Sequence, residues 1–162
     1  MARPTRLSLV TVVFETELAL LDLQARSLAA YVQPDDLASI IVIDNSARGM
    51  GAGTRRRLLG QYGPHRDAVR IVRPEEITEV PAASGWLVQQ VLKLVVADLV
   101  PTSHYLVLDA KDHFVRHSSV ADFVAEDGRA RVPAYSYVDH PLRLQLENVL
   151  AYLGIDPEPY RE

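Results

Sequence analysis

The chain has 162 residues, of which 48% are hydrophobic, and this is enough apolar material to build the core of one domain, residues 1–162. Its formal net charge of −4 argues against a general binder of nucleic acid or of anionic membranes. It contains no cysteine, which excludes a disulfide framework and a zinc site built on thiolates.

The first apolar segment is LSLVTVVF, residues 7–14, and its β-branched residues predict a buried strand. The segment is too short for a membrane-spanning helix and lacks the small-residue cleavage pattern of a signal peptide. We therefore expect a cytoplasmic protein without a membrane span.

Helix and strand patterns alternate along the next part of the chain. A helix is predicted over residues 17–32, and a second buried strand over residues 39–43. A loop leads into a basic helix over residues 54–61, and DAVRIV, residues 67–72, predicts a third and shorter strand.

The segment 85–116 predicts an amphipathic helix, a break at Pro101 and a strongly apolar strand. One broad arc of the helix collects apolar side chains, namely Leu87, Val88, Val91, Leu92, Leu94, Val95, Val96 and Leu99. The run YLVL, residues 105–108, is typical of a strand covered on both faces. Residues 113–116 are either its continuation or a separate strand.

Weaker patterns follow. Residues 128–132 are a candidate strand, and residues 142–153 predict an amphipathic helix that ends before Gly154. Alternation of strands and helices implies right-handed crossovers between parallel strands. The sequence therefore predicts an α/β fold, with three α/β/α layers around a mostly parallel central sheet.

Polar residues follow three of the predicted strands, at Glu15, at Asp44-Asn45 and at Asp109 to Asp112. Ligands bind at the carboxyl ends of the strands in open α/β sheets, so we expect Asp44 and Asp109 to face a common cleft. Aspartate is also frequent in turns, and this structural alternative stays open for both.

Three stretches, VTVVFET, SIIVIDNSA and YLVLDAKD, resemble the nucleotide-binding half of GT-A glycosyltransferases, and of their inverting, family-two-like members in particular. The resemblance covers roughly residues 7–116. It implies a Rossmann-like domain that transfers a sugar from a nucleoside diphosphate sugar to an acceptor of unknown identity. By the same resemblance, Asp44 would contact the base and Asp109 the ribose or the diphosphate.

The predicted helix before the last strand has a polar face with Trp86, Gln89, Gln90 and Lys93. This face is either solvated or part of the site, because Lys93 is long enough to reach a phosphate. With these residues, the predicted nucleotide-sugar site consists of Phe14, Glu15, Asp44, Asn45, Trp86, Gln89, Gln90, Lys93, Asp109 and Lys111.

The resemblance implies a divalent cation, Mn²⁺ or Mg²⁺, on a D-x-D motif, but Lys111 replaces its second aspartate. An ammonium group cannot ligate such an ion. Either Lys111 neutralises the diphosphate directly, or a metal lies on Asp109, Asp112 and His113.

Two further alternatives concern function. The glycine-containing loop 49–53 is either an anion nest at a helix N-terminus or a flexible surface loop, and its spacing favours the loop. Members of the resembled family usually continue with an acceptor-binding part, whereas this sequence stops at Glu162. A catalytically silent nucleotide-binding or protein-interaction module is therefore the alternative to a transferase.

Overall fold

The computed structural model describes residues 6–80, 85–132, 139–156 and 158. The chain divides into two compact units, Met1–Ala130 and Arg131–Glu162, which are described separately. Whether residues 1–162 act as the single expected domain stays a prediction. None of the helices in the described parts of the chain is long and apolar enough to cross a membrane.

The first unit alternates strands and helices as predicted. Its main elements are β1 (Leu7–Val13), α1 (Leu18–Tyr31), β2 (Leu37–Asp44), α2 (Ala52–Gln61), β3 (Val69–Val72), α3 (Gly85–Val95) and β4 (Tyr105–Asp109). Short 3₁₀ helices lie at Glu15–Glu17, Pro34–Asp36, Gly63–Ala68, Pro74–Glu76, Val96–Leu99 and Val120–Asp122.

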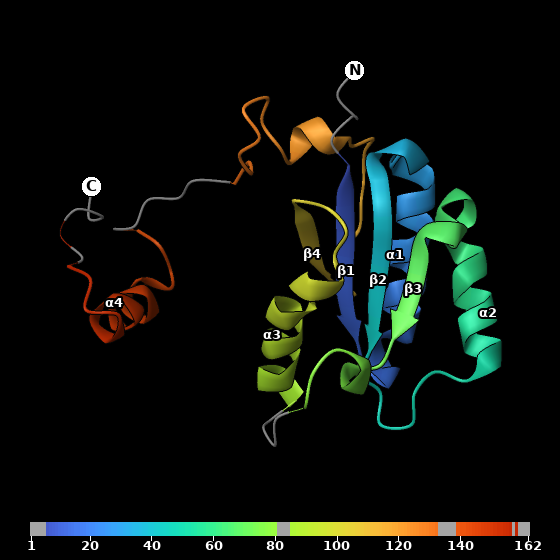
Figure 1. Cartoon of the computed structure of the whole chain (residues 1–162), viewed down its shortest axis with the longest axis horizontal. Coiled ribbons are helices and arrows are strands. Elements are labelled where there is room, and N and C mark those ends of the chain that lie inside the picture. The colour runs from blue at the N-terminus through green and yellow to red at the C-terminus, as the bar shows by residue number, and fades with distance from the viewer. Residues whose placement is uncertain (1–5, 81–84, 133–138, 157, 159–162) are drawn as a thin grey trace. The chain divides into compact units, whose positions relative to one another are not determined.

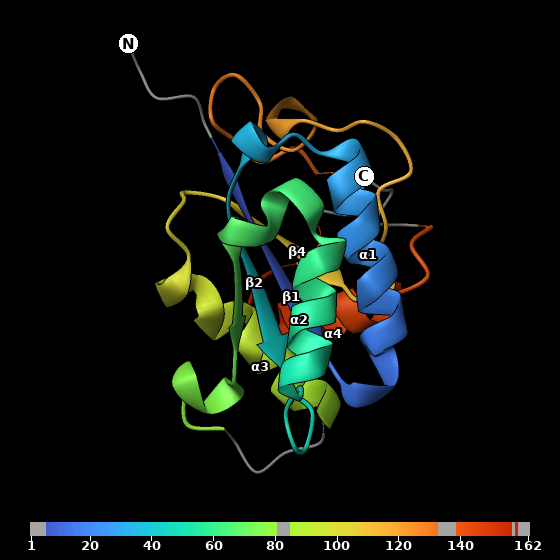
Figure 2. The same ribbon diagram turned by 90° about the vertical axis from the view of Figure 1, so that its right-hand side faces the viewer.

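The four strands form one sheet in the order β3-β2-β1-β4, and every neighbouring pair is parallel. Helices α1 and α2 cover one face of the sheet and α3 covers the other (Figures 1 and 2). The three-layer α/β/α fold with a parallel sheet is therefore confirmed. The chain adds β2 and β3 on one side of β1 and β4 on the other, so the topological switch point lies between β1 and β4.

The core consists of two apolar clusters, one on each face of the sheet. Leu21 and Leu28 of α1 pack on the first face, and Val88 and Leu92 of α3 pack on the second. Successive residues of β1 alternate between them, because side chains of a strand point to opposite faces in turn. Every residue of β1 is buried.

Four predictions about these elements need correction. Strand β4 is not covered on both faces, since Val107 is 36% exposed and lies at the edge of the sheet that the structure describes. The buried stripe of α3 is narrower than predicted, because Leu87 and Leu94 are exposed. Residues 113–116 and 128–132 form no strand; there the described chain makes one isolated bridge, between Val124 and Ala130.

The second unit contains α4 (Arg143–Tyr152), which confirms the predicted helix. None of its residues is buried. Gly154 follows it with φ of +67°, the left-handed conformation that glycine adopts most easily after a helix.

Candidate functional site

The carboxyl ends of β1, β2 and β4 lie at one edge of the sheet, because all strands are parallel. Val13 is paired with Asp44, and Val12 is paired with Asp109. Val12 belongs to the apolar cluster beneath α3, and Val13 to the cluster beneath α1. Paired residues share a face, so Asp109 points to the α3 face and Asp44 to the opposite face. The expectation that the two carboxylates face a common cleft is therefore wrong.

Asp109 lies between two lysines. Its Oδ1 accepts a hydrogen bond from Nζ of Lys93 at 2.7 Å, and its Oδ2 lies 3.7 Å from Nζ of Lys111. The hydrogen bond from Lys93, helped by the charge of Lys111, holds the pKa of Asp109 below its ordinary value, although partial burial acts in the opposite direction. Asp109 is therefore ionised at neutral pH.

These two residues are the only lysines in the sequence; the other basic side chains among its 17 are arginines. Lys93 comes from α3 and Lys111 from the turn after β4, so the fold joins them across the switch point. Because the sequence has only two lysines, their occurrence on either side of the strand YLVL could have marked them together as candidate site residues.

The turn after β4 is held by its own backbone and by a buried glutamine. Asp112 accepts a hydrogen bond from the backbone N–H of Asp109 at 2.8 Å. Nε2 of Gln24 donates to the carbonyl oxygens of Asp109 at 2.7 Å and Asp112 at 3.1 Å, and Oε1 of Gln24 accepts from Thr11 at 2.9 Å. Gln24 is 1% exposed. We did not predict it as a site residue from the sequence, although a polar glutamine between Leu21 and Leu28 on the buried stripe of α1 was a visible irregularity.

The predicted metal ligands do not form a metal site. In the described residues no group of three or more His, Asp or Glu side chains is arranged to hold an ion, and this includes Asp109, Asp112 and His113. The oxygens of Asp109 face Lys93 and Lys111, and Asp112 faces the backbone. Two ammonium groups would repel a divalent cation, so these residues do not fit Mn²⁺ or Mg²⁺.

Asp44 organises the loop that follows β2. Its side chain has no exposed surface, and its two oxygens accept hydrogen bonds from the backbone N–H groups of Ser46 and Met50. Arg73 lies 3.6 Å from Oδ1 and donates to the carbonyl oxygens of Asp44 at 2.6 Å and Ser46 at 2.7 Å. Gly49 adopts φ of +70° in this loop. These contacts favour the turn interpretation of Asp44 over contact with a base.

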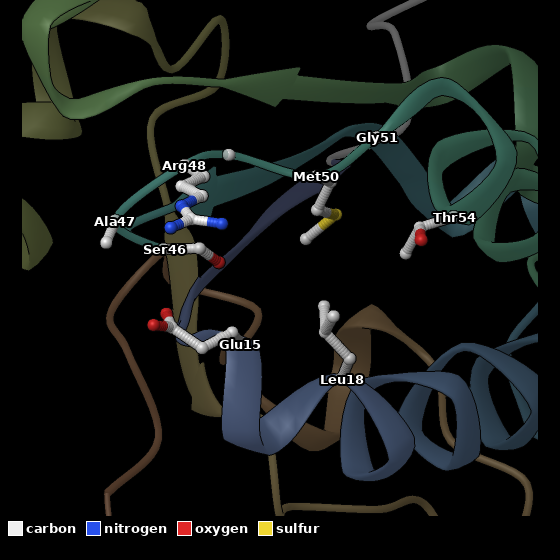
Figure 3. Close-up of a pocket in the computed structure, with 9 residues that line it drawn as sticks. Glu15, Leu18, Ser46, Ala47, Arg48, Met50, Gly51 and Thr54 are labelled. Atoms are coloured by element: carbon white, nitrogen blue, oxygen red, sulfur yellow. The ribbon is translucent and has the colours of Figure 1, made fainter.

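A pocket of about 460 Å³ lies between this loop and the first turn after β1 (Figure 3). Its lining residues are Glu15, Leu18, Ser46, Ala47, Arg48, Gly49, Met50, Gly51 and Thr54. Glu15 is thus the one predicted site residue that lines it. Figure 3 shows the loop residues on one side of the pocket, facing Glu15 and Leu18 on the other.

The remaining predicted site residues are not among those that line this pocket. The ring of Phe14 lies 3.8 Å from the position that a Cβ atom would take at Gly85. The start of α3 therefore lies beside the end of β1. Trp86 is 66% exposed, whereas Gln89 and Gln90 are partly buried. Asn45 donates its backbone N–H to the carbonyl oxygen of Val13 at 2.9 Å.

Comparison with known proteins gives one family match. A model described as a family of unknown function, DUF6492, matches residues 7–145. No curated protein sequence matches the chain. Two solved structures of LgtC are similar to it, one of an active-site mutant and one of the galactosyltransferase in complex with donor and acceptor sugar analogs. Each has 20% sequence identity and a TM-score of 0.48, covering 69% of this chain and 40% of LgtC.

Proposed function

This chain belongs to the DUF6492 family, a family of unknown function. We propose that it transfers a sugar from a nucleoside diphosphate sugar to an acceptor. The donor would lie at the carboxyl edge of the sheet, beside the switch point between β1 and β4. This is the place where open parallel sheets bind ligands.

The observation that carries the proposal is the position of Lys93 and Lys111 at this switch point, on both sides of Asp109. In sugar transfer the nucleoside diphosphate is the leaving group, and negative charge develops on it as the bond to the sugar breaks. Two lysines supply positive charge for the diphosphate without a metal ion. Asp109 keeps the lysines in place and offers an acceptor for a ribose hydroxyl.

Other residues predicted from the sequence fit the same edge. Phe14 offers an aromatic ring at the end of β1, and Trp86 offers an exposed ring on α3. Aromatic rings stack on nucleobases. Gln89 and Gln90 supply amide groups on the same helix.

A second candidate function is a catalytically silent nucleotide-binding module. It is favoured by the pairing of both lysines with Asp109, since this carboxylate offsets one of their two positive charges and leaves less charge to stabilise a departing diphosphate. Binding without turnover is the result that this candidate predicts.

The test is titration of the protein with UDP and GDP, in Mn²⁺ and in EDTA, by calorimetry. Reductive methylation with ¹³C adds a direct readout, because the lysine signals come from Lys93 and Lys111 alone. We expect binding that EDTA does not weaken, with movement of both lysine signals. Lys93→Ala and Lys111→Ala should each weaken binding about tenfold, the loss of roughly one charged hydrogen bond.

Arg116→Ala is the matched control. Arg116 is an exposed cation that also follows β4, but it pairs with Asp122 and not with Asp109. It should leave binding unchanged. Release of UDP from UDP-sugars then separates the two candidates, since the transferase releases it and the silent module does not. Absence of binding to either nucleotide contradicts both, and loss of binding in EDTA contradicts the replacement of the metal by lysine.

A further inference from the structure

The pocket beside Ser46 contains polar groups that the nucleotide-sugar proposal does not use. Ser46 is 5% exposed, and its hydroxyl has no hydrogen-bond partner in the described part of the protein. Its backbone is fully engaged, because its N–H donates to Asp44 and its carbonyl oxygen accepts from Gly49 and Arg73. Figure 3 shows the Ser46 hydroxyl directed into the pocket. A buried hydroxyl without a partner costs free energy, which a bound ligand would recover.

The N-terminus of α2 meets the same pocket. The first amide groups of a helix have no partner within it, and the N-cap of α2 is Gly51, whose lack of a side chain leaves them uncapped. Gly51 and Thr54 line the pocket, and a Cβ at Gly51 would meet nothing within 4 Å. Residue 51 therefore places no side chain over these donors, and the helix dipole makes this end positive.

The charged residues at the pocket are Arg48 and Glu15. Arg48 lies above Ser46, and its guanidinium group faces the pocket (Figure 3). The carboxylate of Glu15 also lines the pocket, at the end far from Thr54 (Figure 3). The Arg48 guanidinium lies at this same end, beside Ser46, so an anion bound to Ser46 would meet the positive charge of Arg48 as well as the negative charge of Glu15.

We propose that this pocket binds a phosphoryl oxyanion. The hydroxyl of Ser46 and the first amides of α2 donate hydrogen bonds to it, and Arg48 neutralises its charge. Asp44 acts as a positioning residue, because it holds the backbone of Ser46 and Met50 in place. The apolar side chains of Leu18 and Met50 suit the carbon part of a small phosphomonoester. The site does not depend on sugar transfer.

The experiment is a titration of the ¹⁵N-labelled full chain with inorganic phosphate, and separately with phenyl phosphate, at constant ionic strength. We expect saturable shifts of the amide signals of residues 46–54. Tighter binding of phenyl phosphate would assign the site to a phosphomonoester, and equal binding to free phosphate. Absence of saturable shifts with both probes would overturn the proposal.

Two variants and a control sharpen the test. Ser46→Ala and Arg48→Ala should each weaken phosphate binding about tenfold, as expected for a hydrogen bond to a charged group. Ser46→Ala removes a hydroxyl without a protein partner, so its melting temperature should not fall. Arg56→Ala removes the same charge from an exposed position of α2 outside the pocket and should have no effect. Unchanged affinity in Ser46→Ala, or equal losses in Arg48→Ala and Arg56→Ala, would overturn the site.

The readouts keep the two proposals separate. Phosphate binding is read at the amides of residues 46–54, whereas UDP binding is read at Lys93 and Lys111. Shifts of the amides by phosphate without shifts of the lysines by UDP would refute the transferase alone. The opposite result would refute the phosphoryl site alone.

Discussion

Asp44 and Asp109 each follow an apolar strand, yet their surroundings differ. Asp44 is buried, and its oxygens are used by loop amides and by Arg73. The side chain of Asp109 is 39% exposed, and its partners are Lys93 and Lys111. A buried carboxylate with such partners organises a loop, whereas a partly exposed one among lysines can exchange its partners for a ligand.

The lowered pKa of Asp109 predicts a pH dependence of stability. A carboxyl group whose pKa falls on folding stabilises the protein above its unfolded pKa, about 3.9 for aspartate, and this stabilisation is lost as the pH falls through the folded pKa. Asp109→Asn should therefore lower the unfolding free energy at pH 7, by no more than about 1 kcal/mol because water screens a partly exposed pair. In urea titrations the difference between the two proteins should begin to shrink as the pH falls to about 4, and should vanish only below the folded pKa of Asp109.

Asp98→Asn is the control, because Asp98 is exposed after the end of α3, outside this cluster. Its effect on stability should not resemble that of Asp109→Asn. A difference between wild type and Asp109→Asn that does not shrink as the pH is lowered from 7 into the acid range would contradict the assignment of the lowered pKa to Asp109.

Helix α2 illustrates how one element combines structural and functional glycines. Gly51 lies at its N-cap beside the pocket, and Gly60 lies within its last turn. Gly60 is exposed, and a Cβ there would meet nothing within 4 Å. Gly63, just after the helix, has φ of +52°, and a Cβ there would lie 3.2 Å from that of Ala29. Of these three glycines, Gly63 is therefore the one whose backbone conformation and close contact require glycine.

Alanine substitution should have opposite effects on stability at Gly60 and at Gly63. Gly60→Ala should raise the unfolding free energy by about 0.5–1 kcal/mol, because alanine has the higher helix propensity and a more restricted unfolded chain. Gly63→Ala should lower it by more than that, since its backbone conformation is strained for alanine. Guanidinium titrations measure both. A destabilised Gly60→Ala would contradict the open space at this position.

The three layers are held together by two unequal halves of the core. Helices α1 and α2 cover β1 and β2 on one face, whereas α3, followed by the 3₁₀ helix Val96–Leu99, covers the other face (Figure 2). Leu92 points from α3 into the core and has no exposed surface, whereas Leu94 of the same helix is 72% exposed. Docking of α3 therefore depends on few side chains, and this docking also places Lys93 beside Asp109.

The same substitution at Leu92 and Leu94 tests this arrangement. Leu92→Ala should lower the unfolding free energy by about 2–5 kcal/mol, because it removes buried apolar surface and leaves a cavity. Leu94→Ala should change it by less than about 0.5 kcal/mol, as is usual for exposed positions. Chemical denaturation measures the difference, and equal effects of the two variants would contradict the orientation of α3.

The amino-acid sequence by itself determined the alternation of strands and helices and the parallel sheet. These depend on local periodicity, as in the apolar runs 7–13 and 39–43, and on short connections that allow few topologies. It also placed Glu15 and Asp109 at the carboxyl edge of the sheet, whereas it left Lys93 open between a solvated helix face and the site.

Only the tertiary structure decided where the polar side chains point and what they meet. Strand register sends Asp44 and Asp109 to opposite faces. The docking of α3 brings Lys93 to a carboxylate 16 residues further along the chain. Burial and partners of a side chain depend on residues remote in the sequence, so local pattern could not foresee the unpartnered hydroxyl of Ser46.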